Sequence, residues 1–240
     1  MILLFTDFGA EGPYLGQMDA VLRQAAPGAE IINLVSDAPA GDPRLSAYLL
    51  AALCRFFPKD SIFVGVVDPG VGGDRLPVVL KADGRWFVGP DNGLFNTVAV
   101  QASQVEWQII GWRPEQLSNS FHGRDLFAPV AARIERGDMT WSGGPYAGPD
   151  LSGWPTDFLR IVYVDHYGNA ITGARYAASL AGLSLAVNDH RIPEAKTFSD
   201  VPEGQPFWYC NSMGLVEIAV NRGRADAELG LAPGMEIGFV

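Results

Sequence analysis

The fold is decided by the stretch Ser61-Ile62-Phe63-Val64-Gly65-Val66-Val67-Asp68-Pro69-Gly70-Val71-Gly72-Gly73-Asp74-Arg75. Residues 61–67 are a hydrophobic run of the length expected for a buried strand, and a turn rich in proline and glycine follows them. Open α/β sheets bind ligands beyond the carboxyl ends of their strands, so Asp68 is predicted to lie in a functional site. Arg75 follows at a spacing that allows the turn to fold it back toward Asp68.

Strand-like and helix-like segments alternate on both sides of this stretch. The expected strands are Ile2–Phe5, Ile31–Val35, Ile62–Val67, Val78–Leu80, Trp86–Val88 and Gln108–Ile110. The expected helices are Gly16–Ala25, Arg44–Phe57, Leu94–Val100 and Leu126–Arg136. Ala82-Asp83-Gly84, between two of the strands, is typical of a hairpin turn. Strands separated by helices predict a mostly parallel sheet that is covered on both faces.

The pattern changes after Arg136. Residues 137–157 are dense in Gly, Pro, Ser and Trp without periodicity, which favours a linker or wrapping segment. Short alternating runs separated by turns then follow: Leu159–Val164, Leu183–Val187, Phe207–Cys210, Val216–Val220 and Glu236–Val240. Such spacing is typical of a small β-barrel or sandwich. We therefore predict an α/β catalytic domain over residues 1–145, a linker over 146–157 and a β-barrel domain over 158–240.

Composition excludes several kinds of partner. The formal net charge of −10 argues against nucleic acid or an anionic membrane, because phosphate binding requires clustered Lys and Arg. We predict no membrane span, because the sequence has no run of about eighteen apolar residues. The N-terminus lacks the basic region of a signal peptide. Cys54 and Cys210 lack metal-ligand spacing, and two isolated thiols are typical of a reduced, cytoplasmic protein.

His122 lies in the second informative stretch, Phe121-His122-Gly123-Arg124-Asp125, at a loop-to-helix junction. A lone histidine is often structural, but a position on a functional loop favours a chemical role. Asp68, Arg75 and His122 together predict an Asp–Arg–His site.

Asp7 follows the first strand and has two interpretations. It is either a helix cap or turn residue, or a carboxylate that accepts the two hydroxyls of a ribose. A metal site formed by Asp7, Asp68, Asp91 and His122 is an alternative for a hydrolase. No pair of ligands at fixed spacing supports that alternative, and Arg75 would repel a cation.

Two glycine-containing turns give weaker evidence of a functional role. Gly70-Val71-Gly72-Gly73 lacks the Walker lysine and is interpreted as backbone that passes close to a ligand or to another chain. Pro90-Asp91-Asn92-Gly93 is interpreted as a turn into a helix. In the β region, polar breaks after two strands, at Asp165–Asn169 and Asn211–Gly214, predict that the rim of the barrel faces a ligand.

In these residues the chain resembles the S-adenosyl-L-methionine (SAM) hydroxide adenosyltransferases, or SAM hydrolases, which are relatives of the adenosyl-fluoride and adenosyl-chloride synthases. The resemblance covers nearly the whole chain, and six motifs in the family's order make it specific. The motifs are Thr6-Asp7-Phe8-Gly9, Val67-Asp68-Pro69-Gly70-Val71-Gly72, Pro90-Asp91-Asn92-Gly93, His122-Gly123-Arg124-Asp125, Asp165 with Gly168-Asn169, and Asn211-Ser212 with Gly214.

The resemblance implies hydrolysis of SAM to adenosine and L-methionine, by attack of water or hydroxide on C5′, without metal or organic cofactor. It also implies a homotrimer with sites at the subunit interfaces. Its catalytic set corresponds to Asp68, Arg75 and His122, and its ribose-binding carboxylate to Asp7. The remaining substrate-binding positions are Asp165 for the methionine ammonium, Ser212 near the methionine carboxylate, Tyr167 and Phe198 as adenine walls, Asn169 as an adenine hydrogen-bond partner, and Asn211.

Departures from the halide synthases favour hydroxide as the nucleophile. Those enzymes carry Tyr where this chain has Asp68, and an extra loop after the equivalent of Asp83. Met213 stands where they use Arg for the methionine carboxylate, and Gly41 stands where an aromatic residue is expected. A metal-dependent hydrolase and a non-catalytic adenosine-binding module remain as alternatives at this stage, and the proton acceptor is either Asp68 or His122.

Overall fold

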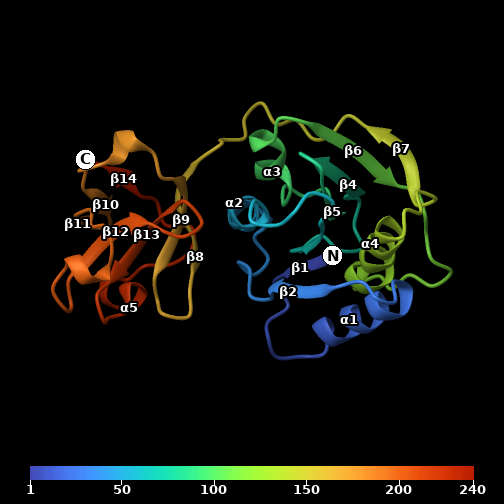
Figure 1. Ribbon diagram of the computed structural model, residues 1–240, viewed down its shortest axis with the longest axis horizontal. Helices are drawn as coiled ribbons and strands as arrows, with labels where there is room; N and C mark the ends of the chain where they lie inside the picture. Colours follow the sequence, from blue (N-terminus) through green and yellow to red (C-terminus); the bar gives the residue numbers. More distant parts are fainter. The chain divides into compact units, whose positions relative to one another are not determined.

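The computed structural model describes every residue from Met1 to Val240. The chain separates into two compact units, Met1–Trp154 (unit 1) and Pro155–Val240 (unit 2) (Figure 1). The boundary between the units lies within the stretch that was expected to be a linker. None of the helices combines the length and the hydropathy that crossing a bilayer requires.

Unit 1 is built on a seven-stranded sheet with the order β2-β1-β3-β5-β4-β6-β7. The strands are β1 (Ile2–Thr6), β2 (Ile31–Val35), β3 (Ile62–Val66), β4 (Pro77–Ala82), β5 (Arg85–Pro90), β6 (Val105–Ile110) and β7 (Ser142–Tyr146). Neighbours among β2, β1, β3 and β5 run parallel, whereas β4 runs antiparallel to both β5 and β6. The predicted α/β class with a mostly parallel sheet is confirmed.

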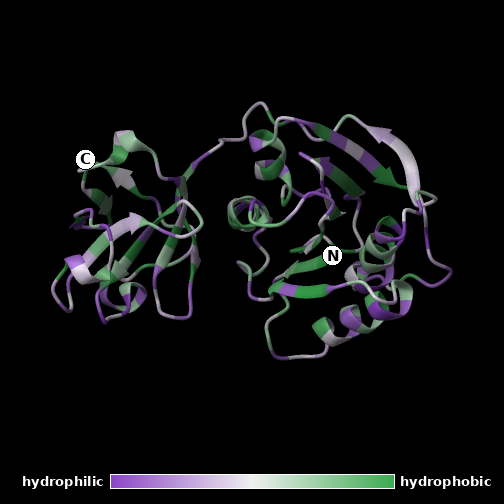
Figure 2. Cartoon of the chain, in the orientation of Figure 1, coloured by the Kyte–Doolittle hydropathy of each residue, from purple (hydrophilic) through white to green (hydrophobic).

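Helices cover both faces of this sheet (Figure 1). They are α1 (Tyr14–Ala25), α2 (Pro43–Cys54), α3 (Asn96–Gln101), α4 (Ala128–Glu135) and a π-helical turn, η1 (Gly123–Phe127). Met18 and Leu22 of α1 share a core with Leu4 and Val64, while α2 and α3 pack against each other. Residues of β1 and β3 are buried throughout because both faces of the sheet are covered, which explains their uninterrupted apolar sequence. Figure 2 shows this as hydrophobic colour along β1 and alternating colour along the amphipathic α1.

Local chemistry explains where α2 begins and ends. Asp42 caps its first turn by accepting a hydrogen bond from the Leu45 amide at 2.9 Å, and Pro43 occupies the first helical position. The helix ends at Cys54, three residues before the predicted Phe57. The amides of Phe56 and Phe57 bond three residues back instead of four, so the chain tightens and leaves the α-helix.

The predicted hairpin is confirmed. Ala82 pairs with Arg85, so Asp83 and Gly84 form a two-residue loop between β4 and β5. Both loop residues have positive φ, 46° and 83°, as the hairpin turn typical of Asp-Gly requires.

One prediction for unit 1 is wrong. Residues 137–157 were interpreted as a linker or wrapping segment without periodicity, but they contain the strand β7, which pairs antiparallel with β6 at the edge of the sheet. The sequence Ser142-Gly143-Gly144-Pro145-Tyr146 has no apolar alternation, so its strand character was not visible. Glycine and proline are tolerated there because an edge strand need not donate every amide.

Unit 2 consists of two antiparallel sheets around one core. The four-stranded sheet has the order β12-β13-β9-β8, and the three-stranded sheet has the order β11-β10-β14. Its strands are β8 (Phe158–Val164), β9 (Ala170–Arg175), β10 (Leu185–Val187), β11 (His190–Ile192), β12 (Pro206–Cys210), β13 (Leu215–Val220) and β14 (Gly238–Phe239), and a short helix α5 (Ala225–Leu229) follows β13. Trp208, Ile218 and Leu185 lie in the shared core.

The glycine-rich turn after β3 approaches the chain itself. Gly72 has a φ of +79°, and a Cβ on it would lie 2.5 Å from the carbonyl oxygen of Asn119. The close contact shown here is with the loop that precedes His122, and the expectation that this backbone also passes close to a ligand or to another chain stays a prediction. This contact joins the turn carrying Arg75 to the loop carrying His122.

Gly72→Ala should accordingly lower the free energy of unfolding by more than Gly137→Ala. Gly137 also has a positive φ, +72°, but a Cβ there meets no atom within 4 Å. The control should lose only the conformational contribution, about 1–2 kcal/mol, whereas Gly72→Ala adds a clash with backbone. Urea unfolding of both variants measures the difference, and equal losses would contradict this account of the turn.

Candidate active site

The structure brings Asp68, Arg75 and His122 together beyond the carboxyl end of β3. The Arg75 Nε lies 3.0 and 3.1 Å from the two carboxylate oxygens of Asp68, and Nη2 also donates to Asp68. The same Nη2 lies 2.9 Å from Nδ1 of His122. The predicted three-residue cluster is thus present, with Arg75 between its two neighbours.

Arg75 is held firmly by its surroundings. Its side chain is 10% exposed and that of Asp68 is 4% exposed, so the ion pair is largely withdrawn from water. Two parallel N–H···O contacts fix the plane of the guanidinium, and the Phe127 ring centroid lies 5.4 Å from Cζ. Pairing with Asp68 therefore fixes the position of the positively charged Arg75 guanidinium at this end of the sheet.

The direction of the Arg75–His122 hydrogen bond determines the state of His122. A guanidinium has only donors, so Nδ1 of His122 must accept and the proton of the neutral ring must lie on Nε2. The pKa of His122 is lowered from its ordinary value, first by burial and second by the charge of Arg75, while Asp68 opposes the change. His122 is thus a neutral imidazole with the Nε2–H tautomer.

A small cavity of about 130 Å³ opens beside this cluster. Its lining includes Asp7, Asp68 and His122, together with Gly41 and Phe121. Asp7 accepts a hydrogen bond from the Gly41 amide at 2.9 Å, so it bridges the loops that follow β1 and β2. The cavity has room for a small nucleophile and the atom that it attacks.

The neighbours of His122 hold the loop in place. Arg124 pairs with Asp125 and donates to Gln17 of α1 at 2.7 Å. Asp125 in turn accepts the Ser118 amide at 2.9 Å. Arg124 and Asp125 therefore tie the loop to α1, and the expected helix start at Leu126 is replaced by η1, a π-helical turn of the kind often found at functional sites.

Of the four residues considered for a metal site, Asp7, Asp68 and His122 line the small cavity, but Asp91 does not. Asp91 accepts the Tyr146 hydroxyl at 2.7 Å, and this hydrogen bond is the main reason that the pKa of Tyr146 rises to about 12. No group of three His, Cys, Asp or Glu side chains in the chain could hold a metal ion. Pro90-Asp91-Asn92-Gly93 is instead the predicted turn that leads toward α3.

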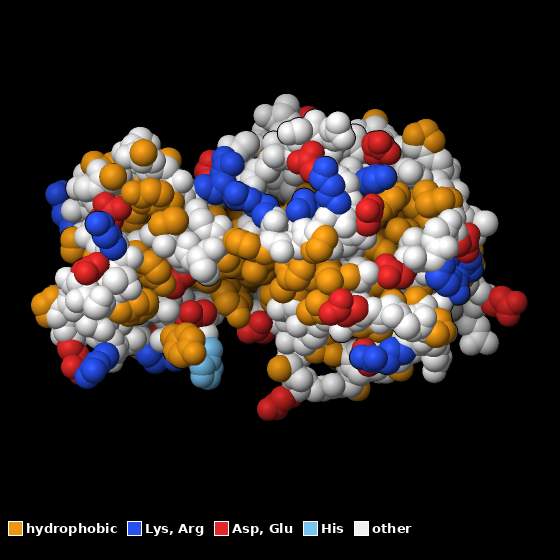
Figure 3. Space-filling model, viewed as in Figure 1, with side chains coloured by type: hydrophobic (Ala, Val, Ile, Leu, Met, Phe, Trp, Pro, Cys, Tyr) orange, Lys and Arg blue, Asp and Glu red, His pale blue; other side chains and the backbone are white.

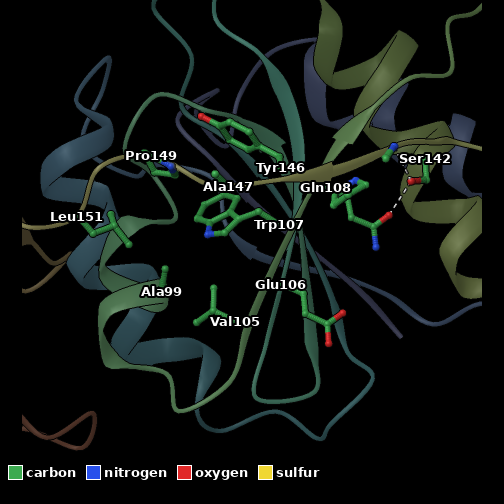
Figure 4. A pocket seen from close by; sticks show the side chains of 12 residues that line it. Ala99, Val105, Glu106, Trp107, Gln108, Ser142, Tyr146, Ala147, Pro149 and Leu151 are labelled. Carbon is green, nitrogen blue, oxygen red and sulfur yellow. Dashed lines mark hydrogen bonds between the residues drawn. The ribbon is translucent and has the colours of Figure 1, made fainter.

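A larger hollow of about 650 Å³ lies over β6 and β7 of unit 1 (Figure 4). Trp107 and Tyr146 form its wall, and Gln108 accepts a hydrogen bond from Ser142 at 2.6 Å. It shares no lining residue with the small cavity, and Glu106 is its one carboxylate. The larger of these two hollows in unit 1 is therefore not the one that lies beside Asp68, Arg75 and His122.

In unit 2, Asp165 and Asn169 close the turn between β8 and β9. The two carboxylate oxygens of Asp165 accept the Asn169 amide nitrogen at 2.9 Å and its side-chain nitrogen at 3.2 Å. Tyr167, at the tip of this turn, is 73% exposed. The turn is thus rigid at its base and presents an aromatic ring at its tip.

A second polar group of unit 2 was only partly predicted. Asn211 donates to Glu217 at 2.8 Å, and Glu217 accepts the Tyr209 hydroxyl at 2.5 Å. The Phe198 ring packs against the Tyr209 ring with centroids 5.6 Å apart, while Ser212 is exposed. Glu217 and Tyr209 were missed. The available signal was a single carboxylate inside the apolar run Leu215–Val220.

The face of the molecule shown in Figure 3 carries charges of both signs. On the face shown in Figure 3, Lys and Arg side chains are interspersed with Asp and Glu and form no broad basic surface. This agrees with the net charge of −10.

The imidazole of His122 should titrate below pH 6.5, its ordinary pKa, because burial and Arg75 disfavour the charged ring. The unfolded chain would take up this proton first, so the stability of the fold should decrease as the pH falls below 6.5. NMR of the ring nitrogens measures both pKa and tautomer, with His122→Ala identifying the signal. A pKa above 6.5, or a proton on Nδ1 of the neutral ring, would contradict the assigned hydrogen bond.

Two family models cover most of the chain. The SAM hydroxide adenosyltransferase N-terminal domain matches residues 2–142, and the C-terminal domain of the same family matches residues 159–238. A curated (R)-S-adenosyl-L-methionine hydrolase from Thermus thermophilus is 36% identical over 255 residues, which cover 98% of both chains. A hydrolase of the same name from Salinispora arenicola is 36% identical and covers 97% of this chain and 94% of its own.

Solved structures agree with these matches. An uncharacterized conserved protein from Thermotoga maritima superposes with a TM-score of 0.91 at 31% identity, covering 100% of this chain and 99% of its own. A conserved hypothetical protein from Thermus thermophilus gives a TM-score of 0.81 at 34% identity over the same shares. In sequence and in fold, the chain belongs to the SAM hydroxide adenosyltransferase family.

Proposed function

We propose that this protein hydrolyses SAM to adenosine and L-methionine, with water or hydroxide attacking C5′ of the ribose. The observation that carries the proposal is the buried Asp68–Arg75–His122 cluster beside a cavity that Asp7 also lines. Full-length relatives named (R)-S-adenosyl-L-methionine hydrolase support the choice of substrate.

The main requirement of this reaction is an activated nucleophile. The sulfonium leaves as a neutral thioether, so the leaving group needs no general acid. Free water has a pKa near 15.7 and attacks poorly at neutral pH. The positive charge of Arg75, whose side chain is nearly buried, lowers the cost of forming hydroxide beside it. Asp68 orients the water and receives its proton, because both ring nitrogens of His122 are occupied, Nδ1 by the Arg75 donor and Nε2 by its own proton.

The ribose and the nucleophile would meet at Asp7 and Asp68. Asp7 lines the cavity, and one of its oxygens is held by the Gly41 amide, which fixes the carboxylate for two neighbouring hydroxyls. Gly41 itself lines the cavity where an aromatic residue was expected, so that wall is formed by backbone. We assign ribose binding to Asp7.

The remaining substrate contacts are assigned to unit 2. Asp165 is proposed to bind the methionine ammonium, and Tyr167, Phe198 and Asn169 to contact adenine. The Met213 amide already donates to Asn211 at 2.9 Å, so the methionine carboxylate is assigned to the exposed Ser212. Asn211 has both side-chain atoms occupied within the chain, which supports a role in shaping the Ser212 loop.

We also propose the residue boundaries of the domains. Family matches at 2–142 and 159–238 support a catalytic domain over 1–145, a linker over 146–157 and a second domain over 158–240, for which we propose a β-barrel. The free thiols of Cys54 and Cys210 support a reducing, cytoplasmic location.

Purified protein should convert SAM to equal amounts of adenosine and L-methionine, and EDTA should leave the rate unchanged. Chromatography of the reaction mixture measures both products. Binding of adenosine without any turnover would favour a nucleoside-binding module instead. Activity lost with EDTA and restored by a divalent ion would favour the metal-dependent hydrolase.

Substitutions in the cluster should lower turnover by about 100-fold or more, the scale of lost acid–base or electrostatic groups. Asp68→Ala, Arg75→Ala and His122→Ala test each member. Arg75→Lys should also be impaired, because an ammonium cannot make two parallel bonds to Asp68 while donating to His122. Steady-state kinetics gives kcat, and isothermal calorimetry checks that SAM still binds. Wild-type rates in all three alanine variants would remove the site assignment.

We further propose a cyclic homotrimer with ligand sites at the subunit interfaces. The proposal rests on the assignment of one ligand to residues of both units, which a closed assembly of identical chains can satisfy three times. Light scattering at assay concentration should give three times the 25.8 kDa chain mass, and SAM should raise the melting temperature. A fully active monomer would rule out shared sites.

A further inference from the structure

Glu217 is a buried carboxylate that the proposed chemistry does not use. It lies on β13, where all residues from Leu215 to Val220 are buried, and its own exposure is 5%. Burial raises its pKa. A polar group in such a place is tolerated only when its hydrogen bonds are satisfied, and here each oxygen has one neutral donor, from Tyr209 or Asn211.

Two chains of contacts, here called branches, start at the Glu217 carboxylate. The first branch runs through Asn211 to the loop that carries Ser212. Glu217 accepts from the Asn211 Nδ2, which directs the Oδ1 of Asn211 toward two backbone amides. Those amides belong to Met213 and Leu215, at 2.9 and 3.0 Å. If the side-chain amide turned over, its NH₂ would face two N–H donors and both contacts would be lost. A group that can only accept hydrogen bonds at Glu217 therefore fixes the loop from Asn211 to Gly214.

The second branch runs through Tyr209 to Phe198. Tyr209 pairs with Glu217 across β12 and β13, and its hydroxyl donates to the carboxylate at 2.5 Å. The Phe198 ring packs edge-on against Phe207 and Tyr209, with centroid distances of 5.0 and 5.6 Å. Glu217 thus anchors the aromatic surface on which Phe198 rests.

We propose that Glu217 is a positioning residue for substrate binding, which holds the Ser212 loop through Asn211 and the Phe198 ring through Tyr209. The proposal rests on the proposed function, since Ser212 and Phe198 are the assigned contacts for methionine and adenine. The carboxylate acts through its hydrogen bonds. The competing role is electrostatic, because Asp165 is also anionic and close enough for its charge to act on Glu217.

Glu217→Gln and Glu217→Met separate these roles. Glutamine keeps both hydrogen bonds, because its oxygen can accept from Asn211 while its NH₂ donates to a Tyr209 hydroxyl that has turned. Methionine has a similar length and keeps neither bond. We expect Glu217→Gln to retain the KM for SAM within about twofold, and Glu217→Met to raise it about tenfold or more with kcat little changed, the signature of lost binding energy.

Thr172→Val is the matched control. Thr172 is fully buried on the neighbouring β9, and its side-chain hydrogen bonds, to the Val216 carbonyl at 2.8 Å and from the Ala174 amide at 3.2 Å, involve no side chain of either branch. Its variant should melt at a lower temperature with an unchanged KM. Tyr209→Phe cuts the second branch alone, so calorimetry should show weaker adenosine binding and unchanged L-methionine binding.

The outcomes are distinct. Equal damage in Glu217→Gln and Glu217→Met would show that charge matters and would overturn the positioning role. A wild-type KM in a folded Glu217→Met variant would also overturn the positioning role. If Glu217→Met does not fold, unchanged adenosine affinity in Tyr209→Phe would overturn it instead. Wild-type protein that never turns SAM over would remove the proposed function, whereas an active wild type with unaffected variants would remove this inference alone.

Discussion

The ion pair between Arg75 and Asp68 is the interaction on which the candidate site depends. Two nearly buried opposite charges are stable only when their hydrogen bonds are complete, and here the third partner is His122. Because Arg75 can only donate, this one contact sets the tautomer of His122, while burial and then the charge of Arg75 lower the pKa of the ring. The same charge that stabilises the fold locally is the charge that would stabilise a hydroxide ion.

The fold of unit 1 brings these groups together from distant parts of the chain. β3 ends at Val66 and places Asp68 beyond the edge of the sheet, as parallel strands do. The glycine-rich turn returns Arg75 to that edge and packs Gly72 against Asn119. Turn and loop are therefore one structural element, and substitutions far from the cavity can misplace the charged cluster.

Unit 2 follows a related principle with neutral partners. Glu217 is buried without a cation, so Tyr209 and Asn211 must orient their donors toward it. Each of them in turn supports a surface group, Phe198 or the Ser212 loop. In both units one buried carboxylate fixes the side chains that hydrogen-bond to it. Those side chains in turn hold nearby residues in position.

Much of this protein was determined by its sequence alone. The apolar runs predicted β1 and β3, and Asp83-Gly84 predicted the hairpin, because these signals depend on neighbouring residues. The order of the motifs along the chain predicted the family. Only the tertiary structure decided that residues 142–146 form an edge strand, that His122 carries its proton on Nε2, and that Glu217 orients Asn211. These features depend on hydrogen bonds between residues far apart in the chain, whose directions no local pattern of side chains records.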